Sequence, residues 1–345
     1  MTAPPPPANT GALSRYRMMR RIRSFEERVG ELFLKGGSAG SMLHLSIGEE
    51  AVAGVTDAMR EGDSFTTHHR GHGVFLGRGG DPARMMSEIA GKEDGYCRGK
   101  GGSMHIADRT LGHLGANAIV GGGIAHVVGA GLSYRNRGGG QISVAFFGDG
   151  AMSQGILYES MNMAALWHLP VIFCCINNQY GMGTRVDRSA GSRDFPARAA
   201  AFGLAAAHAD GADVEAVHDA ARALVAGARD GRPGYLEIDA YRFYGHARMD
   251  KSPYRSPEEE AEGRLRDPVA ASRARVLAQG LASGDELARF DAEAGAEMDA
   301  ALAHALGAPA PDHATMFQDV YAPGTPAPRP QSERLAAILS EEMRA

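Results

Sequence analysis

The sequence predicts an α/β fold with a doubly wound, mainly parallel sheet flanked by helices, and with helical extensions at both ends. Two observations support this prediction. The segment 142–176 has the pattern of a buried strand, a turn, a helix and a second buried strand, and a further helix and strand follow within 213–238. Strands that alternate with helices in this way are parallel and are joined by right-handed crossovers. The Ala- and Glu-rich stretch after Pro257 has a helical pattern instead.

Length and composition exclude several classes of protein. At roughly 150 residues per domain, the 345 residues make about two domains or one large α/β unit. The formal net charge of −5 argues against a nucleic-acid-binding protein. Three cysteines do not make a disulfide framework, and no stretch reaches the ~18 apolar residues of a membrane-spanning helix. The Pro-rich start lacks the pattern of a signal peptide, so we expect a cytoplasmic protein that does not bind a membrane.

The N-terminal part is expected to contain two helices and a long irregular stretch. Residues 1–13 are expected to be disordered. Apolar residues recur every three or four positions from Ser14 to Leu34, which indicates an amphipathic helix. A second helix is expected over 49–59. The segment 66–131 is rich in His and Gly, and we expect loops and helix starts arranged around a ligand.

The rest of the chain divides into three regions. Residues 14–260 are expected to form the main α/β domain, 261–307 a C-terminal helical region, and 308–345 a Pro-rich linker ending in a short helix over 333–343. The further elements expected within the main domain are strands over 142–147, 171–176 and 235–238, helices over 154–167 and 213–227, and a polar loop over 241–255.

Polar residues follow two neighbouring strands of the predicted sheet. Asp149 comes after the first strand and Asn178, 29 residues later, after the second. Ligands of open parallel sheets bind beyond the carboxyl ends of the strands. With the backbone carbonyl of Tyr180, these side chains offer the hard oxygen donors that Mg²⁺ prefers. Gly150 lets the backbone approach a phosphate, and a helix from Ala151 onward would present N–H groups to it. The sequence therefore predicts a magnesium–diphosphate site, for which a simple helix-capping Asp is the disfavoured alternative.

Several further stretches of the chain match the motifs of one known family, in the same order along the sequence. The turn 148–150, the following helix and the Asn177-Asn178 pair resemble the thiamine diphosphate motif. Further matching stretches are His44 to Ala51, His69 to Gly73, Gly99 to His105, Ile119 to Gly121, Asn162 to Trp167, Tyr180 to Thr184 and Tyr241 to His246. Together they resemble the alpha subunit of the thiamine diphosphate-dependent dehydrogenase component of 2-oxo acid dehydrogenase complexes, the family of pyruvate and acetoin dehydrogenase alpha subunits. The resemblance implies a thiamine diphosphate-binding fold.

The resemblance also implies roles for individual positions. Three would supply oxygen ligands to Mg²⁺, and would thereby also bind the cofactor: Asp149, Asn178 and the carbonyl of Tyr180. Seven more would contact thiamine diphosphate: His69, Arg70, Ala118, Val120, Gly150, Ala151 and His246. Three are candidate catalytic residues, of which the first would face the substrate: His44, His72 and His246.

Some positions depart from the family pattern. His69 stands where Tyr is common, Ala125 where Pro is common, and Ile176 where Glu is common. Ala247 follows the histidine of the last motif in place of the Ser that animal pyruvate enzymes phosphorylate, so that control is not expected at this position. None of these departures removes an expected metal ligand.

The chain is expected to contain half of an active site. Thiamine catalysis needs a carboxylate on the pyrimidine nitrogen, which single-chain enzymes place in another complete α/β domain. Only 85 residues follow position 260, and their pattern is helical or Pro-rich, which is too little for a second such domain. We therefore expect a beta subunit that supplies the activating Glu, in a heterotetramer of two alpha and two beta chains, and a lipoyl acyltransferase as the acceptor of the acyl group.

The expected enzyme is an oxidoreductase that decarboxylates a 2-oxo acid and uses a lipoyl disulfide as acceptor. The stretches 180–184 and 241–246 favour pyruvate. The stretch 67–73 favours acetoin as the alternative, and a branched-chain 2-oxo acid is a third possibility. An idle assembly subunit is disfavoured because the predicted metal ligands are present. A transition-metal cluster of His68, His69 and His72 is also disfavoured, because this Gly-rich loop offers no Cys or Asp partner.

Overall fold

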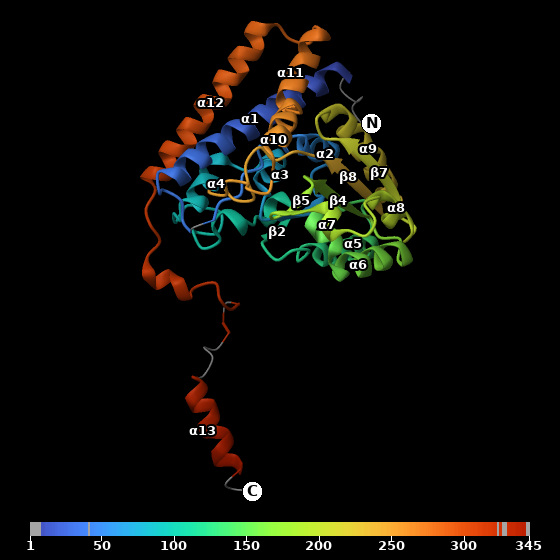
Figure 1. Cartoon of the computed structure of the whole chain (residues 1–345). Coiled ribbons are helices and arrows are strands. Elements are labelled where there is room, and N and C mark those ends of the chain that lie inside the picture. The colour runs from blue at the N-terminus through green and yellow to red at the C-terminus, as the bar shows by residue number, and fades with distance from the viewer. Residues whose placement is uncertain (1–7, 41, 323, 326–329, 343–345) are drawn as a thin grey trace. The chain divides into compact units, whose positions relative to one another are not determined.

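A sheet of six parallel strands forms the centre of the fold (Figure 1). The computed structural model describes residues 8–40, 42–322, 324–325 and 330–342. The strands stand in the order β2-β1-β3-β4-β8-β7, and neighbouring strands pair in parallel. Their bounds are Ser64–His68 (β1), His113–Asn117 (β2), Ser143–Gly148 (β3), Val171–Asn177 (β4), Ala205–Asp210 (β7) and Gly234–Asp239 (β8). The predicted fold class is therefore confirmed. A short antiparallel pair, β5 (Tyr180–Gly181) and β6 (Thr184–Arg185), lies outside this sheet.

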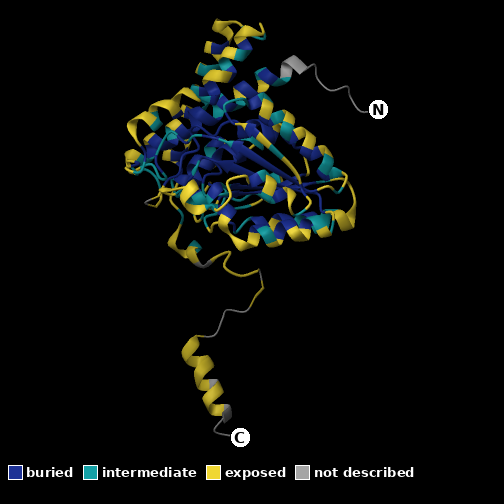
Figure 2. Ribbon diagram, turned by 45° about the vertical axis from the view of Figure 1, so that its right-hand side comes forward, coloured by how far each residue is buried: buried dark blue, intermediate teal, exposed yellow. Residues whose placement is uncertain are grey.

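Helices cover both faces of the sheet and create two hydrophobic cores. One face carries α5 (Ile124–Arg137), α6 (Gly155–Leu166), α7 (Val186–Ser189) and α8 (Phe195–Ala200), and the other carries α2 (Val52–Ala58) and α9 (Val214–Arg229), with α1 (Ala8–Leu34) packed on α2. Side chains alternate between the faces along each strand. Phe146 and Cys174 belong to one core, while Phe147 and Phe173 belong to the other. The strands at the centre of the sheet are therefore buried on both faces (Figure 2).

Three helices follow the loop 241–255, and two of them pack against the first helix of the chain. They are α10 (Pro257–Leu265), α11 (Pro268–Ala278) and α12 (Gly284–Gly307). Helices α11 and α12 contact α1, and α12 also contacts α4 (Pro82–Ile89). Arg21 Nε donates to Glu297 Oε2 at 2.8 Å, which ties α1 to α12. The helical region 261–307 is thus part of the compact unit that ends at Ala310.

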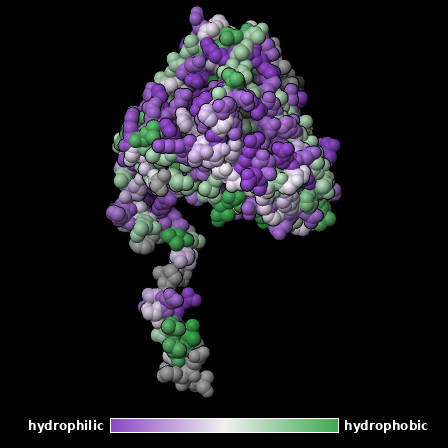
Figure 3. Space-filling model, viewed as in Figure 1, coloured by the Kyte–Doolittle hydropathy of each residue, from purple (hydrophilic) through white to green (hydrophobic). Residues whose placement is uncertain are grey.

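The residues from Pro311 onward form a separate unit. It contains a 3-10 turn, His313–Phe317, and the helix α13, Gln331–Glu342. Leu335, Ile338 and Leu339 of α13 are each more than half exposed, and Figure 3 shows hydrophobic residues gathered on this helix. Helix α13 corresponds to the helix predicted over 333–343, of which position 343 lies outside the described residues.

Several elements differ from the predictions. Helix α1 begins at Ala8 rather than Ser14, so residues 8–13 are helical, and positions 1–7 of the expected disordered segment lie outside the described residues. The segment 66–131 contains most of β1, all of α3 (His72–Gly77), α4 and β2, and half of α5, rather than mainly loops. Strand β7 stands where no strand was predicted. Within the described ranges, no helix combines the length and apolarity needed to cross a membrane.

Candidate cofactor-binding and active site

A cavity of about 360 Å³ opens at the carboxyl ends of the strands. It lies at a topological switch point, because β1 leads to β2 on one side while β3 leads to β4 on the other. All the positions predicted to contact the cofactor or the metal line this cavity. They are His69 and Arg70 after β1, Ala118 and Val120 after β2, Asp149, Gly150 and Ala151 after β3, Asn178 and Tyr180 after β4, and His246 after β8.

Asp149 presents a buried carboxylate to the cavity. It directly follows β3 and is 4 % exposed. Burial raises its pKa to about 6, although the backbone amides of Asp149 and Asn178 and the charge of Arg242 act in the opposite direction. Among the residues that the structure describes, no cationic side chain forms an ion pair with this carboxylate. A buried carboxylate without a cationic partner is well suited to receive a metal cation.

The turn after β3 differs from the predicted helix start. Residues Asp149–Ser153 form a 3-10 turn, and α6 begins only at Gly155, so the N–H groups near Gly150 belong to the turn. A Cβ added to Gly150 would lie 3.5 Å from the Cα of Gly181 in the loop after β4. Side chains at these two glycines would fill the space between the two loops.

Glu49 fixes the orientation of the Asn178 amide. Asn178 Nδ2 donates to Glu49 Oε1 at 2.8 Å, and Asn178 Oδ1 accepts a hydrogen bond from Tyr180 N at 3.3 Å. Glu49 is 2 % exposed, burial raises its pKa, and its Oε2 has no hydrogen-bond partner within the described part of the chain. Arg70 Nε lies 3.7 Å from Glu49 Oε1. Glu49 was not predicted as a site residue, yet it holds a predicted metal ligand in place.

The carbonyl of Tyr180 follows a strained backbone position and accepts a hydrogen bond from a buried arginine. Gln179 has a left-handed conformation, with φ of 69°. The Tyr180 carbonyl accepts a hydrogen bond from Arg242 Nη1 at 3.1 Å. A carbonyl oxygen has two lone pairs, so this bond leaves one for a metal. Arg242 was also missed in the sequence; its burial, followed by the charge of Arg70, lowers its pKa to about 10.

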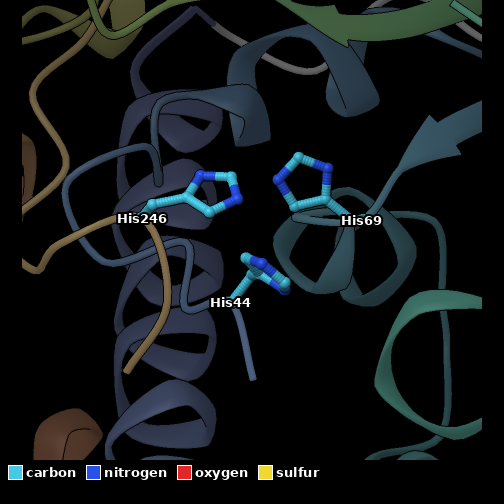
Figure 4. A group of neighbouring side chains, drawn as sticks. All are labelled: His44, His69 and His246. Carbon is cyan, nitrogen blue, oxygen red and sulfur yellow. The ribbon is translucent and has the colours of Figure 1, made fainter. Parts of the chain in front are cut away.

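Three histidines converge beside the cavity (Figure 4). The ring centroids of His44 and His69 lie 4.5 Å apart, those of His44 and His246 4.8 Å, and those of His69 and His246 5.2 Å. Burial, followed by the charge of Arg70, lowers the pKa of His44 to about 3 and that of His246 to about 4. Burial also lowers the pKa of His69. All three rings are therefore neutral at pH 7.

Comparison with known proteins decides the family. The profile of the family described as "Dehydrogenase E1 component" matches residues 17–314. The chain belongs to this family. The alpha subunit of acetoin:2,6-dichlorophenolindophenol oxidoreductase from Cupriavidus necator is 42 % identical over 312 residues, which cover 90 % of this chain and 93 % of that protein. The pyruvate dehydrogenase E1 component subunit alpha of Rhizobium meliloti is 40 % identical over 311 residues, 89 % of each chain. The acetoin enzyme's alpha subunit from Bacillus subtilis is 39 % identical over 313 residues, 90 % of this chain and 93 % of that protein.

The predicted resemblance to dehydrogenase E1 alpha subunits, which are oxidoreductase components, is thus confirmed. In this E1 chain, the loop 241–255 is fixed beside the cavity by a polar network. His246 N donates to Asp250 Oδ2 at 2.8 Å, and the Tyr254 hydroxyl donates to the same oxygen at 2.6 Å. Arg242 Nη2 donates to the Tyr254 hydroxyl at 2.7 Å, and Arg70 Nη2 donates to the carbonyl of His246 at 2.8 Å. The network positions His246.

Of the three predicted catalytic histidines of this E1 chain, His246 lines the cavity, His44 packs against His69 and His246 beside it, and His72 lies apart from it. His72 is 2 % exposed, and its Nδ1 lies 3.2 Å from both carboxylate oxygens of Glu26. Its Nε2 lies 2.9 Å from Ser103 Oγ. His72 therefore joins α1 to the Gly-rich stretch around Ser103, and its catalytic role stays a prediction. The signal for the missed site residues Glu49 and Arg242 was their place inside two stretches that matched the family.

Proposed function

We propose that this chain is the alpha subunit of a thiamine diphosphate-dependent 2-oxo acid dehydrogenase, which decarboxylates pyruvate in the cytoplasm and passes the acyl group to a lipoyl acyltransferase. The observation that carries the proposal is a buried anion and buried cations around one cavity. Asp149 has no cationic partner among the described residues, and Arg70 and Arg242 reach the same space. This distribution of charge suits a divalent cation that is bound together with a diphosphate.

The residues present fit this cofactor. Mg²⁺ would be held by three oxygen donors: the Asp149 carboxylate, the Asn178 amide oxygen and the Tyr180 carbonyl. The diphosphate would be contacted by Gly150, Ala151, Arg70 and His246. When bound, thiamine diphosphate supplies a thiazolium that serves as the electron sink for decarboxylation. Among the described residues, the unpaired carboxylate of Asp149 is the feature that a cation would satisfy.

The histidines would act on the substrate as neutral groups. A neutral imidazole donates a hydrogen bond from one nitrogen and accepts at the other. Since the pKa of His44 lies near 3 and that of His246 near 4, neither ring is protonated to the imidazolium form at pH 7, and each keeps a single N–H. We expect them to orient the oxygen atoms of the substrate and to stabilise developing negative charge by hydrogen bonding.

A second subunit is part of the proposal. Apolar side chains that line the cavity are widely exposed: Ile119 is 73 % exposed, Met182 64 % and Val120 51 %. Gathered apolar exposure of this kind marks an interaction surface. It supports a beta subunit that covers the cavity and supplies the activating glutamate, in a heterotetramer of two alpha and two beta chains.

Acetoin is the second candidate substrate. His69, which stands where Tyr is common in the family, lies at the cavity beside His44, and two of the similar relatives are alpha subunits of acetoin oxidoreductases. A branched-chain 2-oxo acid is the third candidate. Comparing turnover of pyruvate, acetoin and branched-chain 2-oxo acids by the chain reconstituted with its beta subunit decides between them.

Calorimetry with thiamine diphosphate and Mg²⁺ tests the site itself. We expect Asp149→Ala to weaken binding by roughly 100-fold or more, because it removes the charged metal ligand. Asp219→Ala, on the exposed side of α9, is the matched control and should bind as the parent chain does. Equal binding by the Asp149 variant would remove the metal assignment.

A further inference from the structure

His44, His69 and His246 form a histidine cluster, of which only His246 is assigned to the diphosphate above. His44, His69 and His246 come from three separate segments, and each can offer one ring nitrogen such that these nitrogens all lie within 4.8 Å of one another. Figure 4 shows the three rings turned toward a common space. The proposed Mg²⁺ site is built from different groups, all of them oxygen donors.

Some ring nitrogens of this cluster are buried without a partner. His44 is 2 % exposed, and its Nδ1 has no hydrogen-bond partner in the described structure. The same holds for Nδ1 of His246. A buried polar atom without a partner costs free energy, which a ligand can recover. Because burial lowers the pKa of all three rings, they are in the neutral form that binds metals.

We propose that His44, His69 and His246 form a binding site for a first-row divalent transition metal such as Zn²⁺, with the fourth coordination position open to the cavity. Imidazole nitrogen is a favoured ligand of these metals, whereas Mg²⁺ prefers oxygen. Tetrahedral zinc with bonds of about 2.0–2.1 Å places its ligand atoms about 3.3 Å apart. Binding would require the ring nitrogens, now within 4.8 Å of one another, to move closer by rotation of His69 and His246, both half-buried.

The charge of Arg70 is the main opposing factor, because it lies close enough to the cluster to lower the pKa of His44 and His246. The Glu49 carboxylate, 3.7 Å from Arg70 Nε, offsets part of this charge. A metal at this position would occupy the space next to the cofactor where the substrate is expected. Competition of Zn²⁺ with the 2-oxo acid therefore follows, and this consequence rests on the proposed function, whereas metal binding does not.

Titration of the full chain with Co²⁺ after chelator treatment tests the site, because tetrahedral Co²⁺ has intense visible absorption. We expect one equivalent of Co²⁺ to bind with a tetrahedral spectrum that Zn²⁺ abolishes. His69→Gln and His246→Gln should each raise the dissociation constant at least ~10-fold, since loss of even an outer-shell partner costs roughly that much. His126→Gln, exposed on α5, is the matched control and should leave the titration unchanged.

Two results would overturn the inference: no tetrahedral spectrum, or an unchanged dissociation constant in both cluster variants. Thermal unfolding of each variant shows whether it is folded, and the half-buried positions of His69 and His246 make a folded variant attainable. Binding of thiamine diphosphate with Mg²⁺ is measured on the same samples. A chain that binds this cofactor but no Co²⁺ leaves the proposed function in place and removes only the transition-metal site.

Discussion

The Asp149 carboxylate destabilises the folded chain whenever it is ionised and no cation is bound. Burial raises its pKa from 3.8 to about 6, so the folded chain holds this proton more tightly than the unfolded chain. The protonated Asp149 carboxyl group therefore stabilises the folded chain fully below about pH 4, and this stabilisation is lost as the pH rises through about 6. A difference of about two pKa units corresponds to at most about 3 kcal/mol.

The first prediction follows for the cofactor-free chain. Asp149→Asn should be more stable than the parent chain at pH 7.5, by about 1–3 kcal/mol, and the difference should shrink as the pH falls and vanish only below about pH 4. Denaturant unfolding at several pH values measures this. A variant that is no more stable at pH 7.5 would show that the carboxylate already has a compensating partner.

The second prediction concerns Glu49, which holds the Asn178 amide. Glu49→Ala should weaken binding of Mg²⁺ with thiamine diphosphate by roughly 10–100-fold, because Asn178 loses the acceptor that orients it. Glu49→Gln keeps an acceptor oxygen for Asn178 Nδ2 and should lose less. Calorimetry on both variants distinguishes this orienting role from simple loss of negative charge, for which the two substitutions would be equally harmful.

At the scale of elements, the loop 241–255 depends on one hydroxyl group. Tyr254 donates to Asp250 and accepts from Arg242, and this network carries His246. The third prediction is that Tyr254→Phe makes the loop more sensitive to proteolysis and lowers stability by about 1 kcal/mol. Tyr244→Phe is the matched control in the same loop, since the described structure shows no hydrogen bond from the Tyr244 hydroxyl. Equal protease sensitivity of the two variants would contradict the role of Tyr254.

Elements that are stabilised by their own local sequence pattern were predicted, and elements that are stabilised by residues far away in the sequence were not. Strand β4 is a continuous apolar run that is buried on both faces, and its sequence alone indicates a strand. Strand β1 is polar, and its buried hydroxyl groups are satisfied by distant residues: Ser64 bonds Ser143 at 2.8 Å, and Thr67 lies 3.1 Å from a ring nitrogen of His113. Such partners cannot be read from a local pattern. Strand β7 is a mainly exposed, Ala-rich edge strand, which has no strand propensity of its own.

The site residues divide in the same way, into those that local spacing predicts and those that only distant contacts bring together. The spacing of Asp149 and Asn178 across one strand–helix–strand unit was enough to place both beside one cavity, because the carboxyl ends of parallel strands meet at one edge of the sheet. Glu49, which contacts Asn178, and Arg242, which lines the cavity, come from segments far from either residue in sequence. No spacing rule links them, so only the three-dimensional structure shows their contacts. His72 is close in sequence to His69 and Arg70, yet its ring contacts Glu26 and Ser103, and its predicted catalytic role stays a prediction.

For the molecule as a whole, the fourth prediction is that the chain alone is inactive. The compact unit that ends at Ala310 contains one six-stranded sheet, and the cavity is lined by widely exposed apolar side chains. Purified chain with thiamine diphosphate and Mg²⁺ should not consume 2-oxo acid at any substrate concentration, and addition of the beta subunit should restore turnover. Robust turnover by the chain alone would refute a divided active site.

The packing of α1 against α11 and α12 has a consequence for biosynthesis. Met19, Ile22, Phe25 and Val29 of α1 are fully buried, and α1 is tied to α12 through Arg21 and Glu297. Roughly 250 residues separate these helices, so at about 5–20 residues per second the ribosome needs some 10–50 s to deliver α12 after α1 has emerged. During that interval the side of α1 that contacts α11 and α12 stays uncovered. We expect chaperones to shield it during translation, and chains that terminate before α12 to aggregate.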